Sequence, residues 1–181
     1  MKQLRGTPLK RFLRDWRRTH TYESEIIILL DSVTYPVNVG SIFRIADAVG
    51  VNEVVLCGAT PVPPHPTITK VGRNKHQNVA WRYEEVASEV LDTHHRAGYQ
   101  NVAIEITDQA EPYYEFSAPS RTCLVLGNED HGVTRASLAH CDAAVFVPMY
   151  GKGRSLNVHI SAAVILYHLA HTSSFNSTKS L

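Results

Sequence analysis

The feature that most constrains the fold is an unbroken run of five apolar residues near the start of the chain, Ile26 to Leu30. A half-exposed strand alternates apolar and polar residues, whereas an unbroken run of this length is typical of a strand buried on both faces. Similar runs recur along the chain, and segments with helical spacing lie between them. The sequence therefore predicts an α/β protein with a mostly parallel sheet flanked by helices.

The same patterning predicts the order of the elements. Strands are expected at residues 26–30, 53–56, 101–106, 122–126 and 143–147. Helices are expected at residues 39–49, 84–96, 134–140 and 156–171. The proline-rich segment 59–66 is expected to be a loop. Gly98 is expected to end the helix at residues 84–96.

The first 20 residues form a basic segment that we treat as an N-terminal extension, followed by a main domain at 21–172 and a Ser/Thr-rich tail at 173–181. Thr7 and Pro8 are suited to starting a helix. Leu9, Phe12, Leu13 and Trp16 then recur at helical spacing. This apolar face needs a surface to pack on, either the body of the domain or a partner subunit.

Positive charge is concentrated in two parts of the chain. The first 20 residues hold seven Lys and Arg against one acid, whereas the rest carries a net charge of −5, and no acid lies between Glu53 and Glu84. Such local fields suit phosphate-rich partners, although a solvated surface is the alternative. The candidate phosphate contacts are Arg14, Arg17, Arg18, Lys70, Arg73, Lys75 and Arg82.

Several classes of protein are disfavoured. No apolar run approaches the roughly 20 residues of a membrane-spanning helix, and no signal-peptide core follows the basic N-terminus. Three distant cysteines argue against a disulfide framework, so we expect a cytoplasmic protein. His168 and His171 lie one helical turn apart without a third ligand nearby, so no metal site is expected.

Three segments follow predicted strands, where parallel sheets bind their ligands. In the first, Asn38 is a candidate N-cap, and Asn38, Ser41 and Arg44 are spaced three residues apart. A helix N-terminus followed by an arginine makes a good anion site. The alternative is a surface ion pair between Arg44 and Asp47.

The second segment runs from a buried strand into an acidic loop, in which Gly127 and Gly132 flank Glu129. The third, 147–158, contains Gly151 and Gly153 but matches neither the dinucleotide-binding nor the ATPase phosphate-loop pattern. An enzyme using a nucleotide cofactor on a small substrate is therefore disfavoured.

The stretch from Ser155 to Thr178 contains no charged residue. Its helix is apolar most of the way round, so it must be buried in the core or in a subunit contact. A domain this small has few sides to bury, which favours a homodimer.

Together, the three segments resemble the three motifs of the SpoU/TrmH family of RNA ribose 2′-O-methyltransferases, within the SPOUT class. Residues 38–50 resemble the first motif, and Leu126 to Glu129 with Gly132 resemble the second. Residues 147–149 followed by 155–158 resemble the third. The motifs occur in the family's order and at its spacing, over roughly Ile26 to Ala170.

The resemblance implies an α/β fold whose C-terminal part forms a trefoil knot around S-adenosylmethionine, and it implies a homodimer. It implies that Arg44 is the catalytic arginine and that the other motif polar residues are Asn38, Glu129, Ser155 and Asn157. The implied cofactor contacts are Glu105, Ile106, Gly127, Val147, Pro148, Met149 and Leu156.

The implied activity is methylation of a ribose 2′-hydroxyl in structured RNA, with a guanosine in the D-loop of tRNA as the preferred target. The alternatives are ribosomal RNA or a catalytically silent RNA-binding homologue. Arginine is essentially never deprotonated, so Arg44 is expected to anchor a phosphate and stabilise developing negative charge rather than act as a base.

Overall fold

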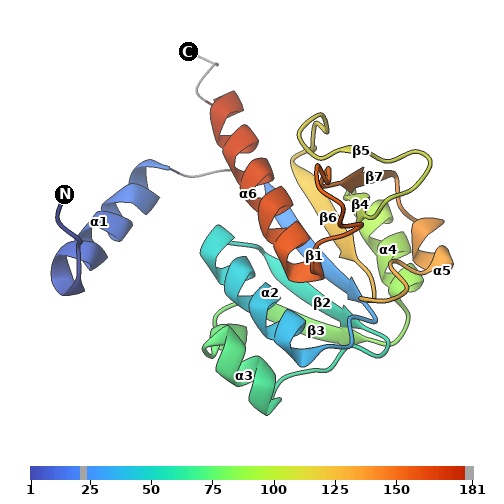
Figure 1. Cartoon of the computed structure of the whole chain (residues 1–181), viewed down its shortest axis with the longest axis horizontal. Coiled ribbons are helices and arrows are strands. Elements are labelled where there is room, and N and C mark those ends of the chain that lie inside the picture. The colour runs from blue at the N-terminus through green and yellow to red at the C-terminus, as the bar shows by residue number, and fades with distance from the viewer. Residues whose placement is uncertain (21–23, 178–181) are drawn as a thin grey trace.

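The computed structural model describes residues 1–20 and 24–177 and contains a seven-stranded sheet, shown in Figure 1. The strand order is β3-β2-β1-β6-β4-β7-β5, and every neighbouring pair is parallel. The strands are β1 (Glu25–Asp31), β2 (Glu53–Cys57), β3 (Ala80–Glu84), β4 (Gln100–Ile104), β5 (Glu111–Pro112), β6 (Arg121–Leu126) and β7 (Ala143–Phe146). The predicted mostly parallel α/β sheet is confirmed.

The structure contains six α-helices among the described residues. They are α1 (Gly6–Thr19), α2 (Pro36–Val49), α3 (Pro66–Gly72), α4 (Ala87–Arg96), α5 (Arg135–Leu138) and α6 (Val158–Ser177), with a short 3-10 helix, η1 (Lys75–Gln77). Helices other than α1 cover both faces of this sheet. The α2, α3 and α6 helices share one hydrophobic core with the sheet, whereas α4 packs in a second core on the opposite face.

The apolar run in β1 separates these two cores. Ile26, Ile28 and Leu30 point into the core beneath α2 and α6, whereas Ile27 and Leu29 point into the core beneath α4. Because successive side chains of a strand point to opposite faces, both faces must be apolar when both are covered. The prediction of a doubly buried strand is confirmed.

Some elements differ from the sequence-based expectation. The sequence did not predict the short strands β3 and β5, because β3 is a half-exposed edge strand and β5 has only two residues. It also did not predict the helix α3. The prediction of Asn38 as an N-cap is wrong, since Pro36 opens α2 and Tyr35 occupies the cap position. The fixed φ of proline suits the first helical turn, so α2 starts earlier than expected.

The α2 and α3 helices cross with their backbones in close contact. A Cβ added at Gly40 would lie 3.0 Å from the Ile68 carbonyl oxygen and 3.2 Å from the Gly72 backbone nitrogen. A Cβ added at Gly72 would lie 2.9 Å from the Gly40 carbonyl oxygen. Both positions therefore require glycine, and the first belongs to the segment that carries Arg44.

The N-terminal helix α1 buries none of its residues and lies outside the body of the sheet in Figure 1. Its apolar face is exposed, with Phe12 and Trp16 each at 52% of full exposure. The surface that this face was predicted to need is not supplied by the described residues of the same chain. Among the described helices, none is long and apolar enough to cross a membrane.

Candidate functional site

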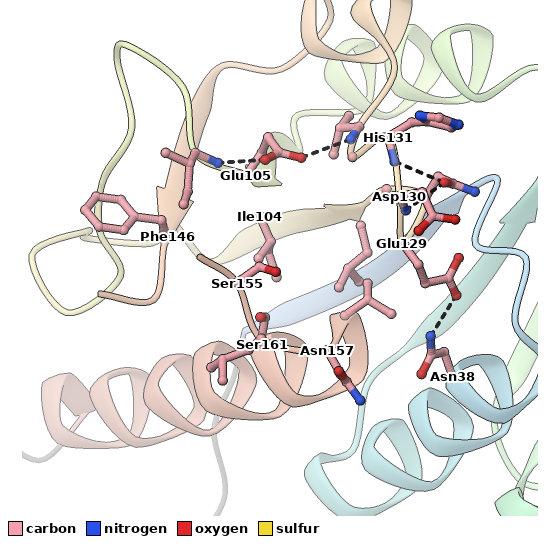
Figure 2. Close-up of a pocket in the computed structure, with 18 of the residues that line it drawn as sticks. Asn38, Ile104, Glu105, Glu129, Asp130, His131, Phe146, Ser155, Asn157 and Ser161 are labelled. Carbon is pink, nitrogen blue, oxygen red and sulfur yellow. Dashed lines mark hydrogen bonds between the residues drawn. The ribbon is translucent and has the colours of Figure 1, made fainter. Parts of the chain in front are cut away.

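A cavity of about 950 Å³ opens at the carboxyl ends of the central strands. Its walls come from the ends of β4, β6 and β7, from the first turn of α2, and from residues 154–158, which lead into α6. Figure 2 shows side chains from these segments converging on one space. The cavity size is within the range of small-molecule sites, and its place follows the rule for open parallel sheets.

The loop that follows β6 folds back tightly on its own start. A Cβ added at Gly127 would overlap the backbone of Gly132 and Val133. Gly132 itself has a φ of +70°, in the left-handed region that glycine adopts without strain. The two glycines therefore allow residues 127–133 to form a closed turn at the cavity wall.

Asn128 fixes this turn from both sides. Its side-chain oxygen accepts hydrogen bonds from the backbone N–H groups of Asp130 at 2.9 Å and His131 at 3.1 Å. Its side-chain nitrogen donates to the Ser32 carbonyl oxygen at 2.9 Å. The loop is thereby tied to the end of β1.

Glu129 connects the loop to the start of α2. Its carboxylate accepts hydrogen bonds from the backbone N–H groups of Thr34 at 3.0 Å and Tyr35 at 3.1 Å, and from the Asn38 side-chain amide at 2.7 Å. Burial acts to raise the pKa of Glu129, but these hydrogen bonds outweigh it, so the pKa lies below its ordinary value. An ionised carboxylate therefore stands at the positive end of the α2 dipole.

A second carboxylate closes the loop onto β4. Glu105 accepts a hydrogen bond from the backbone N–H of Val133 at 3.1 Å and one from its neighbour Ile106 at 2.9 Å. Glu105, Glu129 and Asp130 all line the cavity, as Figure 2 shows. Three carboxylates favour a ligand that carries positive charge.

The segments predicted to carry chemistry meet at this cavity. Of the predicted cofactor and motif residues, those that line it are Asn38, Glu105, Ile106, Gly127, Glu129, Val147, Met149, Ser155, Leu156 and Asn157. Pro148 is not among the lining residues. Arg44 also lies outside the lining and is exposed on α2, where Asp47 pairs with Lys75 at 2.6 Å instead of with Arg44.

The predicted RNA contacts occupy different environments. Lys70 and Arg73 are exposed, as are the arginines of α1. Lys75 is engaged with Asp47, and Arg82 pairs with Glu53 and with Glu84 at 3.2 Å. The structure thus gives Lys75 and Arg82 structural partners that the acid-free stretch of sequence did not suggest.

Sequence reasoning missed other residues of the site. Phe146 and Arg154 line the cavity, and His159 on α6 contacts the Asn38 side-chain oxygen at 2.8 Å. The sequence feature that could have identified His159 as a site residue is its position directly after the third motif. It is a polar residue at the start of a charge-free helix.

Comparison with known proteins supports the architecture. Residues 25–167 match the model of the SpoU rRNA Methylase family. The structure of the A. aeolicus TrmH/SpoU tRNA modifying enzyme superposes with a TM-score of 0.78 at 25% identity, covering 93% of this chain and 86% of that one. The structure of the SpoU methyltransferase AviRb from Streptomyces viridochromogenes, in complex with AdoMet, superposes with a TM-score of 0.75 at 27% identity. This match covers 84% of this chain and 59% of AviRb.

Curated relatives act on different RNAs. A 23S rRNA (guanosine(2553)-2′-O)-methyltransferase, RlmP of Bacillus subtilis, is 32% identical over 143 residues, which is 79% of this chain and 57% of RlmP. A tRNA (guanosine(18)-2′-O)-methyltransferase of Escherichia coli is 30% identical over 145 residues, 80% of this chain and 62% of the relative. The chain thus spans less than two thirds of these relatives.

The fold and the cavity are those of a parallel α/β protein with a ligand site at the carboxyl ends of its strands. Within that class, the chain belongs to the SpoU rRNA Methylase family.

Proposed function

We propose that the chain transfers a methyl group from S-adenosylmethionine to a ribose 2′-hydroxyl in RNA. The observation that carries this proposal is the meeting of three distant segments at one acid-lined cavity. In that cavity, Glu129 and Asn38 join the loop after β6 to the helix that bears Arg44. The relatives that match over this region are named as 2′-O-methyltransferases of guanosine.

The cavity suits S-adenosylmethionine chemically. Its wall combines apolar side chains such as Leu126, Phe146 and Met149, which suit a nucleobase, with carboxylates that suit a cationic ligand. The bound cofactor would supply an electrophilic methyl group on a positively charged sulfur. We further propose that the segments around 127–133 and 147–157 form the trefoil knot implied by the family resemblance.

Arg44 is proposed to act on the RNA side of the reaction. It is exposed and lies outside the cavity lining, which suits a phosphate anchor or an oxyanion stabiliser better than a cofactor contact. Arg44 lies one turn beyond Gly40, and Arg73 directly follows Gly72. Because those glycines touch, both arginines are expected to share one anion-binding surface.

The preferred substrate remains a guanosine in the D-loop of tRNA, and the Escherichia coli relative is named as a methyltransferase of a tRNA guanosine. Ribosomal RNA is the second candidate, because the Bacillus subtilis relative methylates a guanosine of 23S rRNA. Both candidate substrates require the same site chemistry, so the site itself does not favour one RNA over the other.

We also propose a homodimer formed through α6. One side of this helix is buried, including Leu166, whereas Ile160 and Tyr167 are 41% and 56% exposed on its outer side. A charge-free helix with an apolar outer side is better explained by a subunit contact than by contact with water.

The direct test measures methyl transfer from labelled S-adenosylmethionine to tRNA and to ribosomal RNA fragments. Calorimetry should show that S-adenosylmethionine binds without RNA or metal.

Arg44→Ala should lower turnover by about 10²–10³ while cofactor affinity stays close to normal, because one transition-state electrostatic contact is lost. Arg96→Ala is the control, since Arg96 pairs with Asp92 on α4.

Binding of NAD or ATP in place of S-adenosylmethionine would overturn the proposed activity. Full turnover by Arg44→Ala would remove that residue from the mechanism. Methylation of ribosomal RNA fragments without methylation of tRNA would select the second substrate.

A further inference from the structure

One side-chain amide joins three segments at the site. The nitrogen of the Asn38 side chain donates to Glu129 at 2.7 Å, and its oxygen contacts Nδ1 of His159 at 2.8 Å. Asn38 belongs to the first turn of α2, Glu129 to the loop after β6, and His159 to the first turn of α6. Asn38 is only 7% exposed, so water does not readily replace either contact.

The hydrogen bonds fix where the protons lie. An ionised carboxylate only accepts hydrogen bonds, so the Asn38 nitrogen must face Glu129 and the Asn38 oxygen must face His159. Because that oxygen is an acceptor, Nδ1 of His159 must carry the hydrogen. Burial lowers the pKa of His159, which keeps the ring neutral near pH 7 and leaves its Nε2 unprotonated.

We propose that His159 is a positioning residue that, through Nδ1–H, orients the Asn38 amide toward Glu129. It thereby locks the start of α2 to the loop at residues 127–133 and to the start of α6. The consequence for turnover rests on the proposed function, because α2 carries Arg44. The orientation of the amide itself does not depend on that function.

Loss of the His159 donor would have two effects. The buried Asn38 oxygen would lose its partner, and a buried polar group without a hydrogen bond costs free energy. The amide would then be held by its hydrogen bond to Glu129 alone, and the link from the start of α2 to the start of α6 would be lost. Since α2 holds Arg44 and the cavity wall is mostly formed elsewhere, turnover should suffer more than cofactor affinity.

Three substitutions isolate the donor position. The side-chain nitrogen of His159→Asn can occupy the place of Nδ1, whereas that of His159→Gln reaches the place of Nε2, and His159→Leu has no donor. We expect His159→Asn to keep at least half of the wild-type kcat. We expect His159→Gln and His159→Leu to lose about tenfold or more, with the Kd for S-adenosylmethionine changed less than threefold.

Equal kcat values for the Asn and Gln variants would overturn the proposal, as would full activity of the Leu variant. Thermal melting shows whether each variant is folded. If the Leu variant does not fold, the comparison between the two amides still decides the question.

Nitrogen-15 NMR of the histidine rings tests the proposal without any activity measurement. The neutral His159 ring should carry its hydrogen on Nδ1 in the wild-type protein and lose that preference in Asn38→Leu. Hydrogen on Nε2 in the wild type would overturn the proposal whether or not the protein methylates RNA. If no RNA is methylated but the Nδ1–H form is found, the proposed activity fails and the positioning role of His159 stands.

Discussion

At the scale of single residues, the shape of the cavity wall depends on glycine, which has no side chain. Gly127 has no room for a methyl group because the backbone of Gly132 and Val133 passes beside it. By contrast, a Cβ added at Gly151 in the nearby loop would have no atom within 4 Å. The two glycines thus belong to neighbouring motif segments but differ completely in steric demand.

We therefore expect Gly127→Ala to displace the loop after β6, because the new methyl group can only be accommodated by moving backbone. Overpacking of this kind typically costs about 1–3 kcal/mol of folding free energy. Calorimetry should show S-adenosylmethionine binding lost or weakened at least tenfold. Gly151→Ala is the matched control and should change neither binding nor melting temperature. Normal cofactor binding by Gly127→Ala would show that the loop is not part of the cofactor site.

A second residue-scale prediction concerns His94, which is 5% exposed and accepts a hydrogen bond from Arg82 at 3.2 Å. Burial, followed by the charge of Arg82, lowers the pKa of His94 below its ordinary value. The unfolded chain therefore binds this proton more readily than the folded protein. The stability that neutral His94 contributes is present above the unfolded pKa of about 6.5 and is lost as the pH falls below it.

Denaturant titrations between pH 8 and pH 5 should show this loss, and it should shrink in His94→Leu. His140→Gln serves as the comparison, because His140 is exposed. An identical pH dependence in the wild type and His94→Leu would exclude His94 as its source.

At the scale of elements, the parts predicted correctly from the sequence are those with strong local patterns. The five apolar runs became β1, β2, β4, β6 and β7, and Gly98 follows α4 with a φ of +84°. The edge strand β3 was missed because its residues are mostly half-buried or exposed, so no apolar run marks it. The hydrogen bonds of Glu129 were missed for a different reason, since they join residues more than 90 positions apart.

The α1 helix provides the element-scale prediction. Its arginines are exposed and its apolar side chains lie on another face, so charge can be changed without removing apolar packing. Reversing Arg14, Arg17 and Arg18 to Glu should weaken RNA binding and flatten its dependence on salt, because phosphate contacts release counterions. S-adenosylmethionine affinity should stay the same. If filter binding shows an unchanged affinity and salt slope, α1 is a packing element only.

At the scale of the whole molecule, two apolar surfaces of the described chain remain uncovered. One is the outer side of α6, and the other is the apolar face of α1. A dimer through α6 would cover the first surface, and α1 could pack against the same partner subunit. The proposed homodimer therefore accounts for features that a single chain leaves unexplained.

We expect Ile160→Glu to convert the dimer into monomers, because an unpaired charge is costly to bury in an apolar contact. Val62→Glu is the matched control, since Val62 is 39% exposed and Ile160 is 41% exposed. Sedimentation at micromolar concentration should show a dimer for the wild type and the control. A wild-type monomer would contradict the proposed assembly.

The central position of β1 has a consequence for how the protein is made. Its neighbour on one side, β2, leaves the ribosome soon afterwards, but its other neighbour, β6, begins 96 positions later, where Arg121 pairs with Glu25. During that interval, one edge of an almost wholly apolar strand has no pairing partner. The growing chain is therefore most prone to aggregation in the interval between the synthesis of β2 and that of β6, and chaperone protection would be needed most before β6 is complete.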